Sequence, residues 1–220
     1  MTEHIHQIFF NIGRGELISI HLFNWTHGKT KLYCEKHNIS HTLWSKEMVE
    51  DLLNSYPQYK QLYEDFRYDI QRIDFARLLI LYHYGGLYLD LDVKPEGKVI
   101  HHIFKKDYFI AKWSDSHLPY NAILGCKKGN LLMLECIEEV KRSYYEKASM
   151  EIYDKWKARF VFQTTGHYAL HRVLKNKIEY TPCVSIYNES KGIKNLSENC
   201  YFIDYSASVW YDEKFKESIE

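Results

Sequence analysis

The chain has 220 residues, a length that fits one folded domain able to bury about 70% of its unfolded surface. Lysine and arginine together number 29, as do aspartate and glutamate, so the formal net charge of zero argues against nucleic-acid binding driven by overall charge. The 5 cysteines are odd in number and none are spaced as C-x-x-C, which argues against a disulfide framework or a cysteine zinc site.

The N-terminal third is predicted to alternate short strands and helices. Residues 5–11 and 39–44 are rich in apolar and aromatic side chains, a composition typical of strands. Ser45 is expected to cap a helix, because its side chain can accept from the free amides of the first turn. The other helices expected here are 16–23 and 29–37, separated by Asn24-Trp25-Thr26, then 45 to about 55, and 57–66 opened by Pro57.

Residues 69–93 predict a helix, a glycine stop and a short buried strand. Apolar side chains recur at helical spacing from Asp69, the expected N-cap, to Tyr84. Gly85-Gly86 then ends the helix, since glycine takes a positive φ without a Cβ penalty. Residues 87–93 are too short and too apolar for anything but a buried strand.

Two carboxylates, Asp90 and Asp92, follow this apolar run. In an extended segment alternate side chains share a face, so both should point the same way while Leu91 enters the core. Adjacent carboxylates repel each other unless a cation lies beside them, and oxygen ligands suit Mg²⁺ or Mn²⁺. Ligands of open α/β sheets bind beyond the carboxyl ends of strands, where this pair falls. The alternative is an exposed D-x-D turn without a function.

The C-terminal half continues the alternation of strands and helices, without an internal repeat or a linker. This predicts a single α/β domain over residues 1–220 with a mixed central sheet flanked by helices. The expected elements are a turn at 94–98, strands at 107–113 and 119–126, a helix after 127–130, a segment of uncertain type at 150–162, a helix at 167–174, β-like segments at 178–180, 184–186 and 200–203, and a polar aromatic tail from 205.

The central stretch resembles the DXD-type glycosyltransferases of family 32, the group of the yeast initiating α-1,6-mannosyltransferase. More distantly, it is similar to the catalytic domains of the large clostridial glucosylating toxins. The residues that carry the resemblance are 5–10, Asp74-Phe75-Ala76-Arg77, 81–92, Asn121 and 206–210. The resemblance implies a GT-A fold, a UDP- or GDP-sugar donor, Mn²⁺ or Mg²⁺, a glycan or other hydroxylated acceptor, and retention of configuration at the anomeric carbon.

The same resemblance assigns roles to individual residues. Asp92 would bind the metal directly, and Asp90 would contact the metal or the ribose. Asp74 and Arg77 would hold the sugar hydroxyls and the diphosphate, which completes a catalytic set of four. The positions expected to contact the nucleotide or the donor sugar, or to close over them, are Gln7, Phe9, Tyr88, Asn121, Ser208 and Trp210. Two departures from the family are Phe9, where many relatives have Trp, and Thr165-Gly166-His167, where many have Thr-Gly-Pro.

The residues support this chemistry but leave alternatives open. Asp74 and Arg77 lie three residues apart on one helix face, so both can reach one ligand, although they could form only an ion pair. Trp210 could be a lid or could pin the tail to the body. Two histidine pairs, His4-x-His6 and His101-His102, lack a third metal ligand in register.

Other functions compete with glycosyl transfer. One is a non-catalytic glycan- or nucleotide-binding module with the same fold, and another is a different Mg²⁺- or Mn²⁺-dependent phosphate-transfer enzyme. The first residues are too polar for a signal peptide, and no apolar run approaches the ~20 residues of a membrane span. We therefore expect a soluble, cytoplasmic protein without a transmembrane segment and without a nucleic-acid partner.

Overall fold

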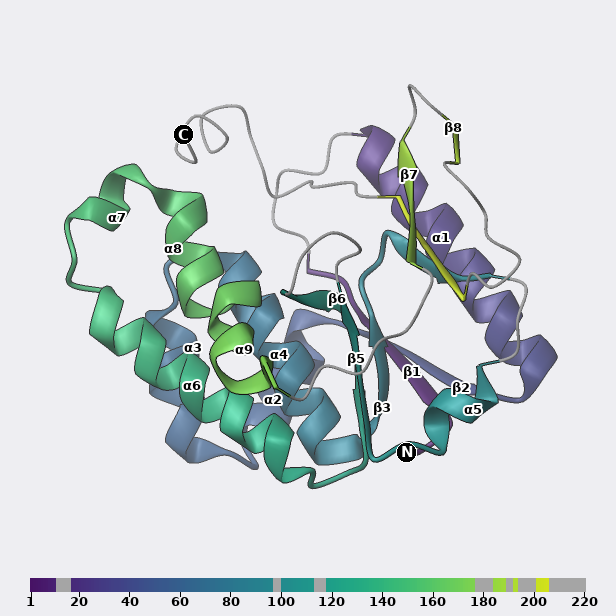
Figure 1. Ribbon diagram of the computed structural model, residues 1–220, viewed down its shortest axis with the longest axis horizontal. Coiled ribbons are helices and arrows are strands. Elements are labelled where there is room, and N and C mark those ends of the chain that lie inside the picture. Colours follow the sequence, from purple (N-terminus) through teal and green to yellow (C-terminus); the bar gives the residue numbers. More distant parts are fainter. Residues whose placement is uncertain are drawn as a thin grey trace.

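The fold is seen in a computed structural model (Figure 1), which describes residues 1–10, 17–96, 100–112, 118–176, 184–188, 192–193 and 201–205. In chain order, the elements of these residues are β1 (His4–Ile8), α1 (Leu17–His37), β2 (Ser40–Trp44), α2 (Lys46–Leu53), the 3₁₀ helix η1 (Pro57–Tyr59), α3 (Lys60–Asp65), α4 (Asp69–Tyr84), β3 (Gly86–Leu89), β4 (Val93–Pro95), α5 (His101–Phe104), β5 (Tyr108–Lys112), β6 (Pro119–Cys126), α6 (Leu131–Lys147), α7 (Ile152–Lys155), α8 (Lys157–Thr164), α9 (His167–Leu174), β7 (Val184–Asn188), β8 (Gly192–Ile193) and β9 (Phe202–Asp204).

The strands form a mixed central sheet in the order β2-β1-β3-β6-β5. β1 pairs in parallel with β2 and β3, whereas β6 runs antiparallel to β3 and β5. A second sheet has the order β4-β9-β7-β8, with β4 antiparallel to β9. The predicted α/β fold with a mixed sheet flanked by helices is therefore confirmed.

The central sheet has an apolar core on each face (Figure 1). Helices α2, α4, α6 and α9 contribute to one core, and α1, α5 and β9 contribute to the other. Side chains of a strand alternate between faces, so Leu87 and Leu89 of β3 enter the core on the α1 side. Tyr88, between them, points to the α4 side, and this brings its ring to the helix that carries Asp74 and Arg77.

A glycine pair joins α4 directly to β3, as the sequence predicted. Gly85 and Gly86 have φ values of +71° and +98°. A Cβ on Gly85 would lie 2.6 Å from the backbone nitrogen of Lys128, and one on Gly86 would lie 2.6 Å from the carbonyl oxygen of His4. No other residue fits at either position without a backbone shift. The glycine pair therefore lets the end of α4 lie close to the backbone of Lys128 and to that of His4 in β1.

Most other predicted elements are confirmed, including β2, α2 with Ser45 as its cap, β6 and α9. The predicted break at Asn24-Trp25-Thr26 is wrong, because α1 is one continuous helix. The Thr26 hydroxyl oxygen lies 2.8 Å from the Leu22 carbonyl oxygen and also contacts the Leu91 carbonyl, so its single proton has acceptors on the helix backbone and outside it. Asp69 is the first residue of α4 rather than its N-cap, which is Tyr68.

Two other segments differ from expectation or fall outside the structure. Residues 94 and 95, predicted as a turn, belong to β4 because they pair with β9. The segment of uncertain type, 150–162, contains α7 and the beginning of α8. The predicted strand at 178–180 and the tail after residue 205 lie outside the described residues. Among the helices that the structure does describe, none combines the length and the apolar character needed to cross a membrane.

His6 links β1 to the glycine pair through a buried neutral imidazole. Its Nδ1 accepts from the Trp44 indole N–H at 3.1 Å, so Nε2 carries the proton and donates to the Gly85 carbonyl at 3.0 Å. Burial, helped by the neighbouring His4, lowers the pKa of His6 to about 3 despite the favourable bond to Gly85. The pKa of His6 is near 6.5 in the unfolded chain and about 3 in the folded protein. The unfolded state therefore binds the proton more readily, and the free energy of unfolding falls as the pH drops below 6.5.

We expect the free energy of unfolding to fall between pH 6.5 and pH 4, with His6 contributing up to about 1.4 kcal/mol per pH unit. Urea denaturation across this range should show a shallower pH dependence for His6→Gln, whose amide can accept and donate as the imidazole does. His21→Gln, at an exposed histidine of α1, is the control and should keep the wild-type slope. If the pH dependence of the unfolding free energy were the same in His6→Gln as in wild type, it would not arise from His6.

Candidate active site

Asp90 and Asp92 lie in a tight turn between the two sheets, which we call the D-x-D turn (residues 90–92). β3 ends at Leu89, and the N–H of Val93 donates to the Asp90 carbonyl at 3.0 Å. The expectation of a continuous strand is therefore wrong, as is the expectation that Leu91 enters the core, because Leu91 is only half-buried. The physical reason is that β4 pairs with β9 of the second sheet, so the chain has to change direction after Leu89.

Asp90, the first residue of the turn, forms hydrogen bonds with β6 on one side and with β1 on the other. The Asp90 N–H donates to the Ala122 carbonyl of β6 at 2.9 Å, and the Gln7 side-chain amide donates to the Asp90 carbonyl at 3.3 Å. The Gln7 Oε1 lies 3.2 Å from His27 Nδ1 and 3.1 Å from His41 Nε2. Burial lowers the pKa of His41 to about 4 and also lowers that of His27. Two neutral imidazoles thus orient the amide that anchors Asp90.

The rest of the turn is held from α1 and from the chain after β9. The Thr26 hydroxyl donates to the Leu91 carbonyl, and the N–H of Tyr205 donates to the Asp92 carbonyl at 2.9 Å. Each of the three carbonyls in the turn is therefore engaged by a different part of the protein. The backbone of the turn is therefore fixed by the surrounding fold.

Arg77 connects α4 to this turn. Its guanidinium lies 3.0 Å from Asp74 and 3.3 Å from Asp90, and it also donates to the Asn121 carbonyl at 2.8 Å. The Tyr88 ring covers it, with 4.9 Å between the guanidinium carbon and the ring centroid. The side chains of Arg77 and Asp74 are 3% and 4% exposed, whereas that of Asp90 is 30% exposed. Asp90 is thus the member of this group that solvent reaches.

The charges of the group depend on one another. Burial alone lowers the pKa of Arg77, but the negative groups around it, Asp90 first, raise the pKa well above its usual range. Burial raises the pKa of Asp74 to about 6, although Arg77 and a hydroxyl bond from Thr165 at 2.8 Å oppose this. The Asn121 amide also donates to Asp74, at 3.3 Å. Arg77 therefore stays charged. Asp74 is shielded from water, and the groups that stabilise its carboxylate are Arg77, Asn121 and Thr165.

Tyr88 acts as a hydrogen-bond donor to the turn. Its hydroxyl lies 2.6 Å from the same Asp90 oxygen that Arg77 contacts. Burial, followed by the carboxylates of Asp90 and Asp74, keeps the pKa of Tyr88 well above its usual value in spite of Arg77. The hydroxyl is therefore protonated at neutral pH, and it fixes the orientation of the Asp90 carboxylate.

The structure brings together five of the ten predicted site residues by direct contact: Asp74, Arg77, Tyr88, Asp90 and Asn121. Gln7 is buried below the turn and contacts its backbone. Phe9 follows β1 and is 39% exposed, whereas Phe10 is buried in the core. Ser208 and Trp210 lie outside the described residues. The predicted contacts of these residues with a nucleotide sugar stay predictions.

Sequence reasoning missed the residues that support the turn from a distance. Thr165 was noted only as part of Thr165-Gly166-His167, yet its hydroxyl donates to Asp74 across 91 positions of the chain. Thr26 and the backbone of Tyr205 were not identified either. None of these residues has a local sequence signal, because a single threonine or tyrosine is common at any surface.

The D-x-D turn fits a hard divalent cation only in part. Carboxylate oxygens are the ligands that Mg²⁺ and Mn²⁺ prefer, and Asp90 is accessible. Within the described residues, however, no group of three or more His, Cys, Asp or Glu side chains is arranged to hold a metal. Magnesium is commonly held by one or two carboxylates together with substrate phosphates. The residues therefore fit a metal that binds together with a phosphate ligand.

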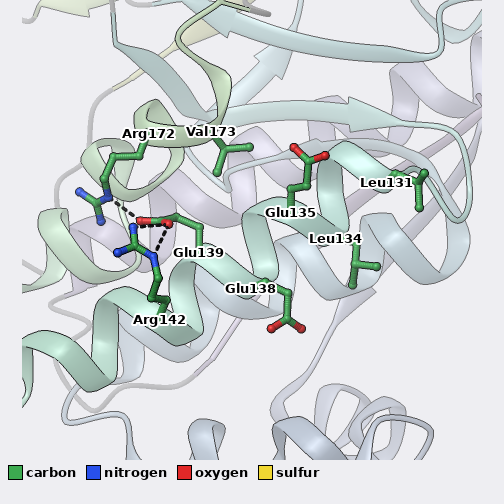
Figure 2. A pocket seen from close by; sticks show the side chains of 8 residues that line it. All are labelled: Leu131, Leu134, Glu135, Glu138, Glu139, Arg142, Arg172 and Val173. Carbon is green, nitrogen blue, oxygen red and sulfur yellow. Dashed lines mark hydrogen bonds and ion pairs between the residues drawn. The ribbon is translucent and has the colours of Figure 1, made fainter.

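A separate surface pocket lies between α6 and α9 and contains none of these residues (Figure 2). Glu139 accepts from Arg142 at 2.6 Å and is also bound by Arg172 of α9. Burial favours a higher pKa of Glu139, but bonds from Arg172, Ser143 and Arg142 outweigh it and lower the pKa. This network holds two helices together, so we regard it as structural.

Comparisons with known proteins find similarity to glycosyltransferases. Residues 23–124 match the family described as "Glycosyltransferase sugar-binding region containing DXD motif". Inositol phosphoceramide mannosyltransferase 3 of Schizosaccharomyces pombe is 32% identical over 103 residues, which are 46% of this chain and 28% of that protein. Mannosyl phosphorylinositol ceramide synthase SUR1 of Saccharomyces cerevisiae is 35% identical over 77 residues, which are 34% of this chain and 20% of that protein.

Among solved structures, "PaToxG Glycosyltransferase" aligns with a TM-score of 0.51 at 18% identity, covering 80% of this chain and 70% of that one. The resemblance to DXD-type glycosyltransferases and the glycosyltransferase fold are therefore confirmed. The chain spans less than a third of the length of the two yeast relatives, and the matched family region includes Asp74, Arg77, Asp90, Asp92 and Asn121.

The buried ion pair between Arg77 and Asp74 leads to a prediction about the free energy of unfolding. Arg77→Met should lower the free energy of unfolding by about 3–5 kcal/mol, because it leaves the Asp74 carboxylate buried without its cation. Adding Asp74→Asn to this variant should recover part of the loss, since the amide can still accept from Asn121. Urea denaturation of both variants measures the difference.

Lys127→Met, which removes one partner of an exposed ion pair, is the control and should lose much less stability. If Arg77→Met were as stable as this control, the electrostatic link between α4 and the D-x-D turn would be unimportant.

Proposed function

We propose that this chain, with its DXD sugar-binding region and glycosyltransferase fold, is a metal-dependent glycosyltransferase. It would transfer a hexose from a UDP- or GDP-sugar to a hydroxyl of a glycan or another acceptor. The observation that supports this most is the contact of Arg77 with both Asp74 and Asp90. It joins the two motifs of the family in one cluster at the end of a sheet strand.

The metal would be held by Asp92 and Asp90, with the remaining ligands from the diphosphate. When bound, Mn²⁺ or Mg²⁺ supplies positive charge that stabilises the leaving diphosphate. Tyr88 and Arg77 share one Asp90 oxygen, so the carboxylate keeps its orientation before the metal arrives. Such preorganisation is what a site of this kind needs, because a metal ligand that rotates freely holds its substrate poorly.

Asp74 and Arg77 would act on the donor mainly through Asp90, because both side chains are almost fully buried. Arg77 would thereby fix the Asp90 carboxylate, which is the accessible member of the group.

We further propose that the reaction retains the configuration of the sugar. Three protein donors surround Asp74: Arg77, Asn121 and Thr165. One oxygen of Asp90 is likewise bound by Tyr88 and Arg77. Neither carboxylate is presented as a nucleophile, which supports front-face displacement in which the leaving phosphate assists the acceptor hydroxyl. The proposal of a hexose follows from the names of the two yeast relatives, both of which refer to a mannosyl group.

Asp92→Ala should lower metal-dependent hydrolysis of the donor by at least about 100-fold, because the metal loses a ligand and the leaving diphosphate loses its counter-charge. The measurement is the release of nucleoside diphosphate from a panel of UDP- and GDP-sugars with Mn²⁺. Asp51→Ala, at an exposed position of α2, is the matched control and should keep wild-type activity. Full activity in Asp92→Ala would remove this residue from the mechanism.

Metal and nucleotide should stabilise the fold only together, since the D-x-D turn provides too few ligands for the metal alone. At about 100 times Kd, UDP or GDP with Mn²⁺ should raise Tm by about 5–10 °C. Mn²⁺ alone should have little effect, and Asp92→Ala should abolish the joint shift. Stabilisation by a free oligosaccharide without metal or nucleotide would instead indicate a glycan-binding module.

A further inference from the structure

A second group of side chains lies against the D-x-D turn on the side of α1. It consists of Trp25, Lys29, Lys94 and Tyr205, and we call it the Trp25 cluster. The Tyr205 ring meets Trp25 edge-on, at 5.2 Å between centroids and 89° between planes. The ammonium nitrogens of Lys29 and Lys94 lie 5.9 Å and 5.5 Å from the centroid of the Trp25 ring. Three side chains from three parts of the chain thus surround the indole of Trp25.

Short links tie the Trp25 cluster to the turn. Thr26, the next residue of α1, donates its hydroxyl to the Leu91 carbonyl. The backbone N–H of Tyr205 donates to the Asp92 carbonyl at 2.9 Å. Lys94 follows Asp92 by two residues, in β4. The Trp25 cluster is therefore attached to the backbone of the turn at Leu91 and Asp92.

The exposure of Trp25 needs an explanation. Indoles are usually well buried, because they carry a large apolar surface. Trp44 is 6% exposed and packs in the core, whereas Trp25 is 44% exposed. Its neighbours Lys29 and Lys94 are charged, and Lys94 is also paired with Glu96. A flat apolar ring beside two cations is complementary to a ligand that has both a ring and a negative charge.

The position of the cluster distinguishes it from the Arg77 group. Arg77 reaches Asp90 from α4, on one face of the central sheet, whereas Trp25 belongs to α1, which packs on the other (Figure 1). The turn thus has a different group on each side. A transferase needs places for two substrates that meet at one anomeric carbon.

We propose that the Trp25 cluster is the acceptor subsite, and that its ligand is a hydroxylated ring carrying a phosphate, such as a phosphorylated polyol or sugar. This inference rests on the proposed glycosyltransferase function. The indole face contacts the C–H groups of the ring, and the two lysines contact the phosphate as point charges. The ring hydroxyl is then held next to the D-x-D turn, where the donor sugar would be bound.

The test is direct binding of myo-inositol 1-phosphate by titration calorimetry at low salt, with no donor present. Wild-type protein should bind the probe, and the affinity should fall as salt is raised, because exposed charges are screened. Trp25→Ala should weaken binding at least about tenfold, whereas Trp25→Tyr, which keeps an aromatic face, should retain most of it. Lys29→Gln with Lys94→Gln should remove the preference for the phosphorylated probe over myo-inositol.

Trp156→Ala is the matched control, since Trp156 also lies next to a cation, Arg159 at 4.8 Å, but on a different part of the surface. It should bind the probe like wild type. Absence of binding to wild type, or equal binding by Trp25→Ala and wild type, would overturn the acceptor subsite. Because the assay contains no donor, failure of donor hydrolysis would instead count against the proposed function alone.

Discussion

The guanidinium of Arg77 is almost fully buried, and a charge removed from water requires partners at hydrogen-bond distance. Asp74 provides one partner from the same helix, and Asp90 provides another from the D-x-D turn. The position of the turn relative to α4 is therefore set by charge as well as by packing. The glycine pair at the end of α4 strengthens this constraint, because the close contacts at Gly85 and Gly86 leave the helix and β3 little freedom to move apart.

The turn itself is a junction of elements that are distant in sequence. Its three carbonyls accept from the Gln7 amide of β1, the Thr26 hydroxyl of α1 and the Tyr205 backbone after β9. These bonds fix the backbone of the turn, and Tyr88 and Arg77 fix one oxygen of the Asp90 carboxylate. The position of this carboxylate is therefore set by the protein before any ligand binds.

The sequence predicted best what depends on neighbouring residues. The helix, the glycine stop and the start of β3 follow from spacing and from the conformational freedom of glycine, and the contact of Asp74 with Arg77 follows from helical periodicity. The conformation of residues 90–92 did not follow, because the pairing of β4 with β9 imposes it from the far end of the chain. The continuity of α1 was missed because the Thr26 hydroxyl has acceptors both on the helix backbone and on the D-x-D turn, so a polar residue fits inside this helix. The partners of Asp74 at Asn121 and Thr165 depend on tertiary structure alone.

The bond between Asp74 and Thr165 spans 91 positions, and this has a consequence for biosynthesis. A ribosome completes α4 long before it reaches α8, so the growing polypeptide holds an acidic side chain whose final hydroxyl donor does not yet exist. Until then water must solvate that carboxylate, and the region around it has to stay open. Vectorial folding from the N-terminus therefore stops short of the finished cluster. A product released early would lack a sealed interior at the place where the Asp74 carboxylate is buried.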